Sequence, residues 1–343
     1  MTDDYRSFYR GRRVMVTGGL GFIGSNLVRQ LVALGADILI VDSLFPDYGG
    51  NLFNIDGLEP CVRVNISDVR DETSMQTLVR GREVIFNLAG QVSHIDSMAD
   101  PHTDLEINCR AQLSMLEACR KHNPTVRVVF AGTRQVYGRP DRLPVDESHL
   151  VRPADINGVN KAAGEYYHLL YNNVFGVRAC SLRLTNVYGP RQLIRHNRQG
   201  FIGWFIRMAI EGREIQVFGD GSQLRDFVYV DDAVDAFLRA GASDACNGEV
   251  FNVGGDGPIS HKDLVALLLD VAGTGSVSFV EWPAEKKRID IGSFYSDSSK
   301  FQRTVGWQPR VDLRSGLRQT IDFYRQHLDR YIGTADRAGG EQA

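Results

Sequence analysis

The sequence lacks the features that mark a membrane-spanning or nucleic-acid-binding protein. It contains no uninterrupted run of about 18 apolar residues, the approximate length that an α-helix needs to cross a bilayer. Its 39 lysine and arginine residues nearly balance its 42 aspartate and glutamate residues, and the formal net charge is −3. Such a chain has no general positive field for nucleic acid or anionic lipid. We therefore expect neither partner, and we expect any anionic ligand to be bound by individual arginines.

Cysteine is also scarce. The 343 residues include five cysteines, which are widely spaced and contain no Cys-x-x-Cys pair. This pattern argues against a disulfide framework and against a zinc site. Residues 1–13 are polar and charged, whereas a secretory signal would show a basic stub followed by an apolar run. The sequence therefore predicts a cytoplasmic protein without a metal centre.

Short apolar runs alternate with amphipathic segments through the first half of the chain. Residues 14–16 and 38–41 are typical of buried strands, and residues 22–34 between them have the spacing of a helix. Further strands are expected at 84–86, 126–130 and 179–184, and a long helix at about 158–175. The buried face of another helix is expected at Leu105, Cys109, Leu113 and Leu116. This alternation predicts an α/β fold with a Rossmann-type, doubly wound parallel sheet.

Glycine and proline become more frequent after Asn186, which indicates a change in organisation. We expect residues 1–185 to form a dinucleotide-binding domain, to which segments at about 226–250 return. Residues 186–333 are expected to form a smaller C-terminal α/β substrate lobe. Residues 334–343 are small and polar, which is typical of a flexible tail.

A glycine-rich run at residues 17–24 lies between the first strand and the first helix. Glycines there allow a tight turn and bring the helix N-terminus close to a pyrophosphate. Asp42 follows at the end of the second strand, where a carboxylate can accept both ribose hydroxyls of an adenosine. A 2′-phosphate would meet its negative charge, so the pattern predicts NAD rather than NADP. The cofactor contacts expected from this unit are Gly18, Gly21, Phe22, Ile23, Gly24 and Asp42.

Five motifs, in order along the chain, resemble one protein family. They read Thr-Gly-Gly-x-Gly-Phe-Ile-Gly at 17–24, Asn-Leu-Ala-Gly at 87–90, Val-Tyr-Gly at 136–138, Arg-Leu-Thr-Asn-Val-Tyr-Gly-Pro-Arg at 183–191 and Arg-Asp-Phe-Val-Tyr-Val-Asp-Asp at 225–232. From about residue 13 to 330 the chain resembles the extended short-chain dehydrogenase/reductases that act on nucleotide sugars, the NAD-dependent epimerase/dehydratase family. The motifs are specific for the family and less specific for the reaction.

The resemblance implies further contacts with the cofactor. Asp68 and Val69 would contact adenine, although from the residues alone Asp68 could equally cap a helix. Ala89 and Gly90 would line the pyrophosphate and ribose. Lys161 would bind the nicotinamide ribose and add positive charge.

The resemblance also implies which residues meet a nucleotide-diphosphate sugar. Thr133 would hydrogen-bond the sugar hydroxyl that is oxidised, and Asn186 would lie near the sugar pyrophosphate. Arg225 would bind a phosphate, for which a guanidinium fork is well suited. Arg288 or the adjacent Lys287 would supply a second cation. Without the motifs around them, solvated surface charge would be the simpler interpretation of these cations.

The family's Tyr-x-x-x-Lys pair is incomplete, because residues 157–161 read Asn-Gly-Val-Asn-Lys. An amide has no proton to exchange near neutral pH, whereas a phenol beside an ammonium group can exchange one. His94 is our first candidate to replace the tyrosine, since histidine titrates near neutrality. A loop histidine bonded to backbone is the alternative. Asp155, His149 and Tyr166 are weaker candidates.

Asn157 itself could contribute to catalysis by orienting a substrate hydroxyl or a water that relays the proton. The segments on either side of it are otherwise well formed, which favours a subclass built around asparagine over decay of the site.

The residues after Thr133 distinguish the reactions of the family. Dehydratases place an Asp-Glu pair there, and decarboxylases usually have a glutamate at the second position, whereas this chain has Arg134 and Gln135. Epimerisation does not need an acidic residue at either of these two positions. We therefore expect an NAD-dependent epimerase of a nucleotide-diphosphate sugar, most simply at carbon 4, that acts by transient hydride transfer to bound NAD. The alternatives are a non-catalytic nucleotide-sugar or NAD-binding protein and another nucleotide-sugar oxidoreductase or dehydratase.

The resemblance extends to assembly. Helices near 101–121 and 157–175 match those that form a four-helix dimer interface in relatives, so a homodimer is expected.

Overall fold

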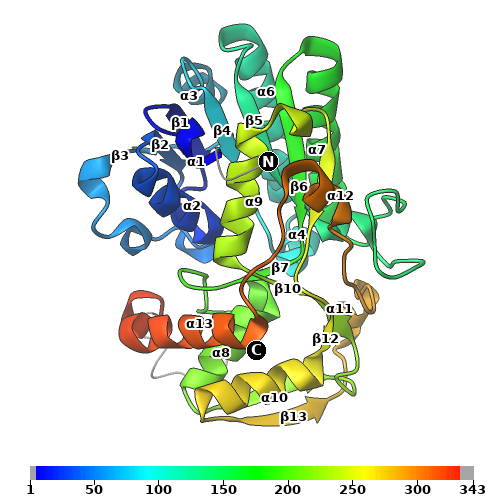
Figure 1. The fold of residues 1–343 in the computed structure, drawn as a ribbon. Coiled ribbons are helices and arrows are strands. Elements are labelled where there is room, and N and C mark those ends of the chain that lie inside the picture. The colour runs from blue at the N-terminus through cyan, green and yellow to red at the C-terminus, as the bar shows by residue number, and fades with distance from the viewer. Residues whose placement is uncertain (1–4, 333–343) are drawn as a thin grey trace.

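The computed structural model describes residues 5–332, in which a large parallel sheet with helices on both faces stands above a smaller group of elements (Figure 1). Seven strands form the sheet in the order β11-β6-β5-β4-β1-β2-β3, and their pairings are parallel. The strands are β1 Arg13–Thr17, β2 Asp37–Asp42, β3 Val62–Ile66, β4 Val84–Asn87, β5 Arg127–Thr133, β6 Arg178–Leu184 and β11 Val250–Val253. The strand order reverses between β1 and β4, which confirms the predicted Rossmann-type, doubly wound fold.

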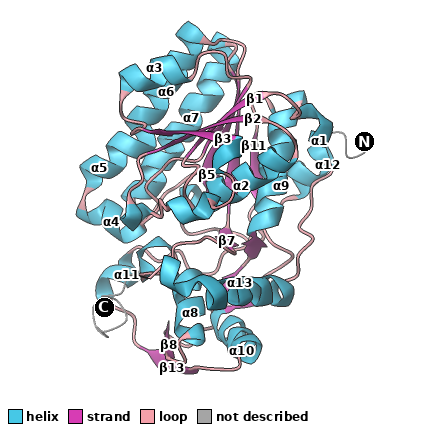
Figure 2. Cartoon of the chain, turned by 90° about the vertical axis from the view of Figure 1, so that its left-hand side faces the viewer, coloured by secondary structure: helices cyan, strands magenta, loops and turns pink. Residues whose placement is uncertain are grey.

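Both faces of this sheet are buried except at the edge strand β3, where Val64 and Ile66 are exposed. Along β1, Val14 and Val16 belong to one cluster of buried side chains, whereas Met15 belongs to another cluster on the opposite face. The strands therefore read as nearly continuous apolar runs. Figure 2 shows the sheet between two helical layers. One layer contains α1 Tyr5–Phe8, α2 Phe22–Ala33, α9 Val230–Ala242 and α12 Ser299–Val305; the other contains α3 Glu72–Leu78, α6 Ala111–His122 and α7 Ile156–Phe175.

The smaller group of elements begins directly after β6. Its parallel pair β7 Asn186–Tyr188 and β10 Phe227–Tyr229 continues the chain beyond the carboxyl end of the sheet. The other members are α8 Phe201–Ile210, β8 Glu214–Phe218, β9 Leu224–Arg225, β12 Ile259–Ser260, α10 His261–Ala272, β13 Ser276–Val280, α11 Ala284–Arg288 and α13 Leu313–His327. Short 3-10 turns occupy 46–48, 52–55, 59–61, 134–137, 197–199, 244–246 and 328–330.

Two later segments return to the large sheet. One runs from α9 through β11, which pairs with β6, and so extends slightly beyond the predicted 226–250. The other is α12, which packs against β11 and which the sequence did not indicate. The division into residues 1–185 and 186–333 stays a prediction. The predicted tail at 334–343, like residue 333, lies outside the described residues.

The segment between β4 and β5 differs from expectation. It consists of α4 His94–Ala99, α5 Pro101–Leu105 and α6, and a π-helical turn at Glu106–Arg110 joins the last two. Of the four residues expected to mark the buried face, only Leu116 is fully buried, and Leu105 is 42% exposed. The predicted face is therefore wrong. A π turn holds an extra residue, so it rotates the helix face relative to an uninterrupted α-helix.

Helix α7 carries the sequence in which the family's tyrosine is missing. It begins at Ile156, slightly earlier than expected, because the Asp155 side chain accepts the Gly158 backbone N–H at 2.7 Å and caps the helix. It ends before Gly176, whose φ of 72° is the left-handed conformation that glycine adopts readily. None of the helices within residues 5–332 has the length and apolar character needed to cross a membrane.

Candidate functional site

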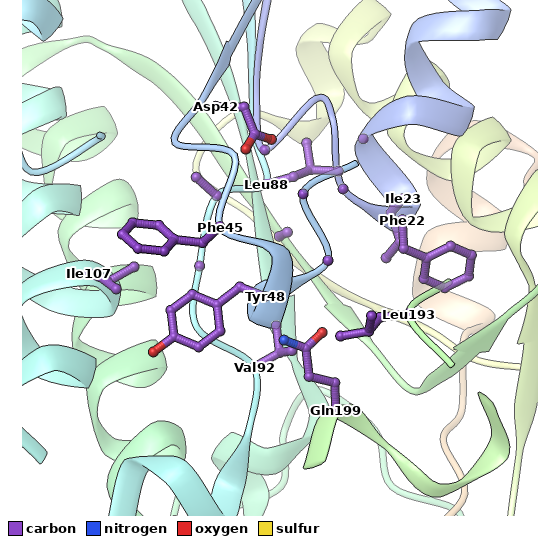
Figure 3. A pocket seen from close by; sticks show the side chains of 18 of the residues that line it. Phe22, Ile23, Asp42, Phe45, Tyr48, Leu88, Val92, Ile107, Leu193 and Gln199 are labelled. Atoms are coloured by element: carbon purple, nitrogen blue, oxygen red, sulfur yellow. The ribbon is translucent and has the colours of Figure 1, made fainter. Parts of the chain in front are cut away.

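One pocket lies at the carboxyl ends of β1, β2, β4 and β5, where the strand order reverses (Figure 3). Open α/β sheets bind their ligands at this location. Every residue predicted to contact the cofactor lines this pocket: Gly18, Gly21, Phe22, Ile23, Gly24, Asp42, Asp68, Val69, Ala89, Gly90 and Lys161. The predicted catalytic residues Thr133, Asn157 and His94 line it too. The structure thus brings together two sets of residues that are far apart in the sequence.

The glycine-rich turn fits a dinucleotide pyrophosphate. Gly18 has a φ of 70°, and a Cβ at Gly24 would lie 2.1 Å from the Gly18 carbonyl oxygen. Only glycine permits this close packing of the turn against the first turn of α2. The N-cap of α2 is Gly21, which has no side chain to satisfy the backbone N–H groups of the first helical turn. Those groups can therefore bind an anion.

Asp42 presents a carboxylate beside this turn. Its Oδ2 accepts the Leu20 backbone N–H at 2.9 Å, and its Oδ1 accepts the Leu44 backbone N–H at 2.8 Å. Burial raises the pKa of Asp42, and the two backbone N–H groups partly oppose this effect. Each carboxylate oxygen can accept a second hydrogen bond, so the group is suited to hold ribose hydroxyls.

Asp68 lines the same pocket and forms an ion pair with Arg70, whose Nη2 lies 2.6 Å from Asp68 Oδ2. The hydrogen bond from Arg70 keeps the pKa of Asp68 below its usual value. The alternative that Asp68 caps a helix is wrong, because the N-cap of α3 is Asp71.

Thr133 and Lys161 both line the pocket. Thr133 ends β5 and accepts the Gln135 backbone N–H at 3.2 Å. The buried Nζ of Lys161 donates to the Ala131 carbonyl at 3.2 Å. Burial lowers the pKa of Lys161 to about 8, although the charge of Asp104 raises it. The ammonium group is therefore near its titration point in slightly alkaline solution.

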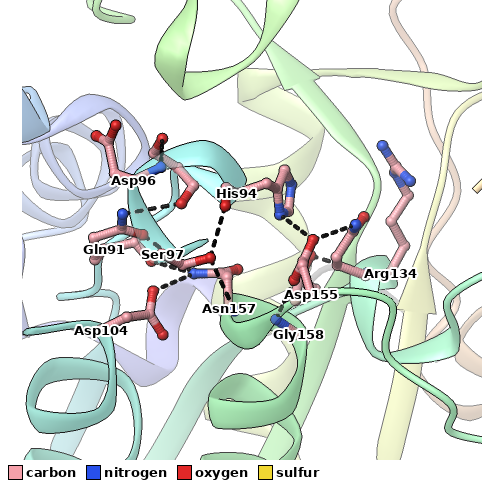
Figure 4. A network of polar contacts seen from close by, with 12 residues as sticks. Gln91, His94, Asp96, Ser97, Asp104, Arg134, Asp155, Asn157 and Gly158 are labelled. Carbon is pink, nitrogen blue, oxygen red and sulfur yellow. Dashed lines mark hydrogen bonds and ion pairs between the residues drawn. The ribbon is translucent and has the colours of Figure 1, made fainter. Parts of the chain in front are cut away.

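Asn157 is 2% exposed and belongs to a buried polar network (Figure 4). Its Nδ2 donates to the Gln91 carbonyl at 2.8 Å and to Asp104 Oδ2 at 3.0 Å. Asp104 also accepts the side-chain amides of Asn160 at 2.8 Å and Asn108 at 3.0 Å. The amide hydrogens of Asn157 are thus engaged within the protein, and its Oδ1 is the atom left for a substrate hydroxyl or a water.

This network joins several elements. Asn108 lies in the π-helical turn, Asp104 in α5, and Asn157 and Asn160 in the first turns of α7. The backbone N–H of Asn157 also donates to Ser97 Oγ of α4 at 3.2 Å. A tyrosine at position 157 would have to displace these contacts, so the surrounding structure is adapted to asparagine.

His94 and Asp155 form an ion pair beside Thr133 and Asn157. His94 Nδ1 lies 3.0 Å from Asp155 Oδ2, with the His94 side chain 38% exposed and that of Asp155 fully buried. Burial raises the pKa of Asp155, but the close contact and charge of His94 outweigh this effect, so the pKa lies below its usual value. Gln135 Nε2 also donates to Asp155 at 2.8 Å. The imidazole thus lies at ion-pair distance from a carboxylate, although Nδ1 is not aligned for a hydrogen bond, and the role of His94 stays a prediction.

Of the three weaker candidates, Asp155 contacts His94, and the other two lie elsewhere. The buried His149 accepts the Asp141 backbone N–H through Nε2 at 3.1 Å, and Tyr166 projects from α7 with 52% of its surface exposed. Neither is among the residues that line the pocket.

The predicted substrate residues are separate from this pocket. Asn186 Nδ2 donates to the Asp226 carbonyl at 2.9 Å, and its Oδ1 accepts Arg134 Nη2 at 3.3 Å. Arg225 is 5% exposed and donates through Nη1 to the Gly292 carbonyl at 2.5 Å. Arg288 lies on the exposed side of α11, as does Lys287. The structure thus places Arg225 in a buried polar region, whereas Arg288 faces solvent.

Comparison with known proteins agrees with this geometry. Residues 14–254 match the model of the NAD dependent epimerase/dehydratase family. A UDP-glucose 4-epimerase of Mycolicibacterium smegmatis is 34% identical over 314 residues, which cover 91% of this chain and 98% of that protein. A dTDP-glucose 4,6-dehydratase of Streptomyces griseus is 32% identical over 321 residues, 92% of this chain and 94% of that protein.

A solved structure is also similar. The UDP-glucose 4-epimerase of Thermus thermophilus in complex with NAD superposes with a TM-score of 0.82 at 30% identity, covering 91% of this chain and 99% of that chain. NAD is the cofactor of the family, and the glycine-rich turn and Asp42 of this chain fit it. The chain therefore belongs to the NAD-dependent epimerase/dehydratase family.

Proposed function

We propose that this protein is an NAD-dependent epimerase of a nucleotide-diphosphate sugar, most simply at carbon 4. The observation that carries the proposal is that His94, paired with Asp155, lines the same pocket as Thr133 and the cofactor-binding residues. A proton carrier is thus available although residue 157 is an asparagine.

Each side chain would have a distinct task. When bound, NAD supplies the hydride acceptor and the hydride donor. Thr133 Oγ1 would hold the sugar hydroxyl, and Lys161 would bind the ribose hydroxyls. His94 Nδ1 faces Asp155, which leaves Nε2 to take the proton of the sugar hydroxyl and later return it. Asp155 would orient the imidazole and stabilise its charged form, as the carboxylate does in other histidine–aspartate pairs.

The residues after Thr133 support epimerisation over elimination. Loss of water needs an acid and a base close to the sugar, whereas Arg134 carries no exchangeable proton at neutral pH. The amide of Gln135 is occupied by its hydrogen bond to Asp155. Sequence identity does not distinguish the two reactions, because the epimerase and the dehydratase relatives are 34% and 32% identical to this chain.

A second candidate is a non-catalytic nucleotide-sugar or NAD-binding protein, which the occupied amide of Asn157 favours. A binding protein would not need a histidine–aspartate pair beside Thr133, so the pair favours an enzyme. Another nucleotide-sugar oxidoreductase or dehydratase is the third candidate. An oxidoreductase that releases its cofactor would require added NAD or NADH in every turnover.

The test is to incubate the purified protein, without added cofactor, with uridine-, thymidine-, cytidine- and guanosine-diphosphate sugars in deuterated water. NMR of the sugar then reports the product. Inversion of one carbon without uptake of deuterium would support epimerisation through a transient ketone. Deuterium at a neighbouring carbon would indicate enolisation, and binding without change would favour the binding protein.

For assembly we propose a homodimer formed through α7. Val159, Tyr166, Leu170 and Val174 are spaced along one side of this helix, and each is about half exposed or more. Leu105 of α5, whose side chain faces away from the core, is a further exposed apolar residue. A row of apolar side chains on a helix is typical of a surface that packs against another chain. A cytoplasmic location remains a prediction.

A further inference from the structure

A group of buried polar atoms without partners lies beside the predicted substrate residues. In the part of the chain that the structure describes, these atoms include Arg134 Nη1, Arg225 Nε, Gln223 Oε1, Asp226 Oδ1 and His261 Nε2. They come from the turn after β5, from β9 and its flanks and from the start of α10. Buried polar atoms are nearly always hydrogen-bonded to protein, water or ligand, so the unpartnered N–H groups of Arg134 and Arg225 are available to an acceptor.

Arg134 is the most informative member of this group. Its hydrogen bond to Asn186 Oδ1 is long, at 3.3 Å, and its guanidinium carbon lies 5.2 Å from the centre of the Phe294 ring. Within residues 5–332, no carboxylate lies within ion-pair distance of it. Arg134 as a whole is partly exposed, although its Nη1 is buried. Desolvation lowers the pKa of Arg134, and the charges of Asp226, Asp155 and Asp290 oppose this effect; a guanidinium stays protonated in proteins.

The nearby acids Asp155, Asp226 and Asp290 have other partners, although Asp226 Oδ1 has none. Asp155 pairs with His94. Asp226 Oδ2 accepts the backbone N–H and the hydroxyl of Ser296, at 3.2 and 3.0 Å. Asp290 Oδ2 accepts Gln223 Nε2 at 2.8 Å. The charges of all three still raise the pKa of Arg134, but within residues 5–332 none of them forms a close ion pair with it.

Arg225 lies close enough to repel Arg134. Burial and the charge of Arg134 together lower the pKa of Arg225 to about 9, although Asp290 and Asp226 raise it. The nearest carboxylate oxygen to Arg225, on Asp290, is 3.7 Å from Nη2. His261 is affected by both arginines: burial lowers its pKa to about 3, and their charges add to the effect. Two guanidinium groups and an imidazole thus share this region with the carboxylates of Asp226 and Asp290, and the one ion pair between them, from Arg225 to Asp290, is long.

We propose that Arg134 and Arg225 together bind an oxyanion group of the nucleotide sugar, with His261 Nε2 as a further hydrogen-bonding atom. The proposal rests on the proposed substrate class. Its new element is Arg134, which follows the pocket-lining Thr133 and contacts Asn186, the neighbour of the pocket-lining Thr185. The oxyanion belongs either to the diphosphate or to a carboxylate on the sugar. Both present the planar or tetrahedral oxygens that a guanidinium fork binds.

The variant Arg134→Gln tests this assignment. Binding is measured by calorimetry on the NAD-loaded protein with UDP, UDP-glucose and UDP-glucuronic acid, the last two of which differ only at carbon 6. Thymidine- and guanosine-diphosphate glucose are included to cover the choice of base. The matched control is Arg318→Gln, which changes an exposed arginine of α13.

If the oxyanion is the diphosphate, Arg134→Gln weakens the binding of every nucleoside diphosphate by at least about tenfold. If the oxyanion is a sugar carboxylate, the wild type binds UDP-glucuronic acid more tightly than UDP-glucose. Arg134→Gln then loses this preference, and its affinity for the other ligands is unchanged. Either result supports the two-arginine site and says which group it holds. Unchanged affinity for all ligands, within about twofold, would overturn it.

A stability measurement separates binding from folding. Removal of a buried, unpaired charge should leave the melting temperature of the ligand-free protein unchanged or raise it. A variant that melts at a lower temperature and has weak affinity would indicate a structural role and contradict the proposal. These experiments measure binding and not turnover. The proposed oxyanion site can therefore be refuted while the epimerase assignment stands, and the epimerase assignment can be refuted while the oxyanion site stands.

Discussion

His94 Nδ1 lies 3.0 Å from Asp155 Oδ2, which joins the first residue of α4 to the N-cap residue of α7. This contact lies within one helical turn of Asn157, the residue at the family's tyrosine position. Asp155 therefore makes two contacts, because it caps α7 through the Gly158 N–H and lies against the imidazole at the pocket. The predictions below follow from this arrangement and from the network around Asn157.

His94→Gln should reduce turnover by about 10²–10⁴, which is the usual contribution of a general acid/base. The change keeps a polar side chain of similar reach but removes the exchangeable proton, so substrate affinity should change little. Steady-state kinetics on the substrate that the NMR panel identifies would measure this. His102→Gln is the matched control, because His102 is exposed on α5. Equal turnover in the two variants would exclude His94 as the proton carrier.

Asp155→Asn should lower turnover while α7 remains capped, because asparagine is as good an N-cap residue as aspartate. The loss comes from the missing charge behind the imidazole, so the expected decrease is about tenfold or more. Helix content by circular dichroism should stay unchanged. Full turnover in this variant would mean that Asp155 serves only to cap the helix.

Asn157→Ala should lower the free energy of unfolding by about 1–3 kcal/mol, because it leaves the buried Asp104 and the Gln91 carbonyl short of a donor. Chemical denaturation would measure the change. Asn173→Ala, at an exposed position of the same helix, is the control. Turnover below the unfolding transition should fall much less than in His94→Gln. The reverse pattern, unchanged stability with abolished turnover, would assign Asn157 a direct catalytic role.

NAD affinity should be constant at lower pH and should fall as the pH rises above about 8, because burial lowers the pKa of Lys161 to about 8. Below that value the lysine is already protonated and can donate to the ribose. Above it, binding must first add a proton, so affinity falls with pH until the pKa of the complex is reached. Fluorescence titration with NAD at a series of pH values would detect this fall in affinity. Lys161→Met should bind NAD weakly and without the pH dependence.

Leu170→Glu should convert the proposed homodimer to a monomer, since it places a charge in the middle of the apolar row on α7. Leu170 is 49% exposed, so the change should leave the folded chain intact. Sedimentation velocity at micromolar concentration would show the species present, with Asn173→Ala as the control. A wild type that is already monomeric would refute the homodimer.

The sheet could be predicted from the sequence because both of its faces are buried. Residues 14–16 and 38–41 are continuous apolar runs, and the glycines between them have few interpretations other than a phosphate-binding turn. The π-helical turn at Glu106–Arg110 could not be predicted, because its apolar spacing fits an ordinary helix equally well. That turn is why Leu105 faces solvent although it was expected in the core.

The site was predicted in part. Spacing around the glycine-rich turn indicated Asp42, and the family motifs indicated Thr133 and Lys161. The pairing of His94 with Asp155 is a long-range contact, to which a single sequence gives no direct clue. The sequence did not point to the role that we propose for Arg134, because at that position it showed only the absence of an acid. Its buried guanidinium becomes informative only once the positions of the neighbouring carboxylates are known.

The central claim is that this chain oxidises and reduces a nucleotide sugar although Asn157 stands where a tyrosine is expected. Rapid mixing of the NAD-loaded protein with its tightest-binding nucleotide sugar, followed by the absorbance of reduced nicotinamide, tests it most directly. We predict that reduced nicotinamide forms and then decays as the sugar is converted, and that its formation is slower in His94→Gln by about 10²–10⁴. Tight binding of the sugar to the wild type with no reduced nicotinamide at any time would contradict the claim and leave a binding protein.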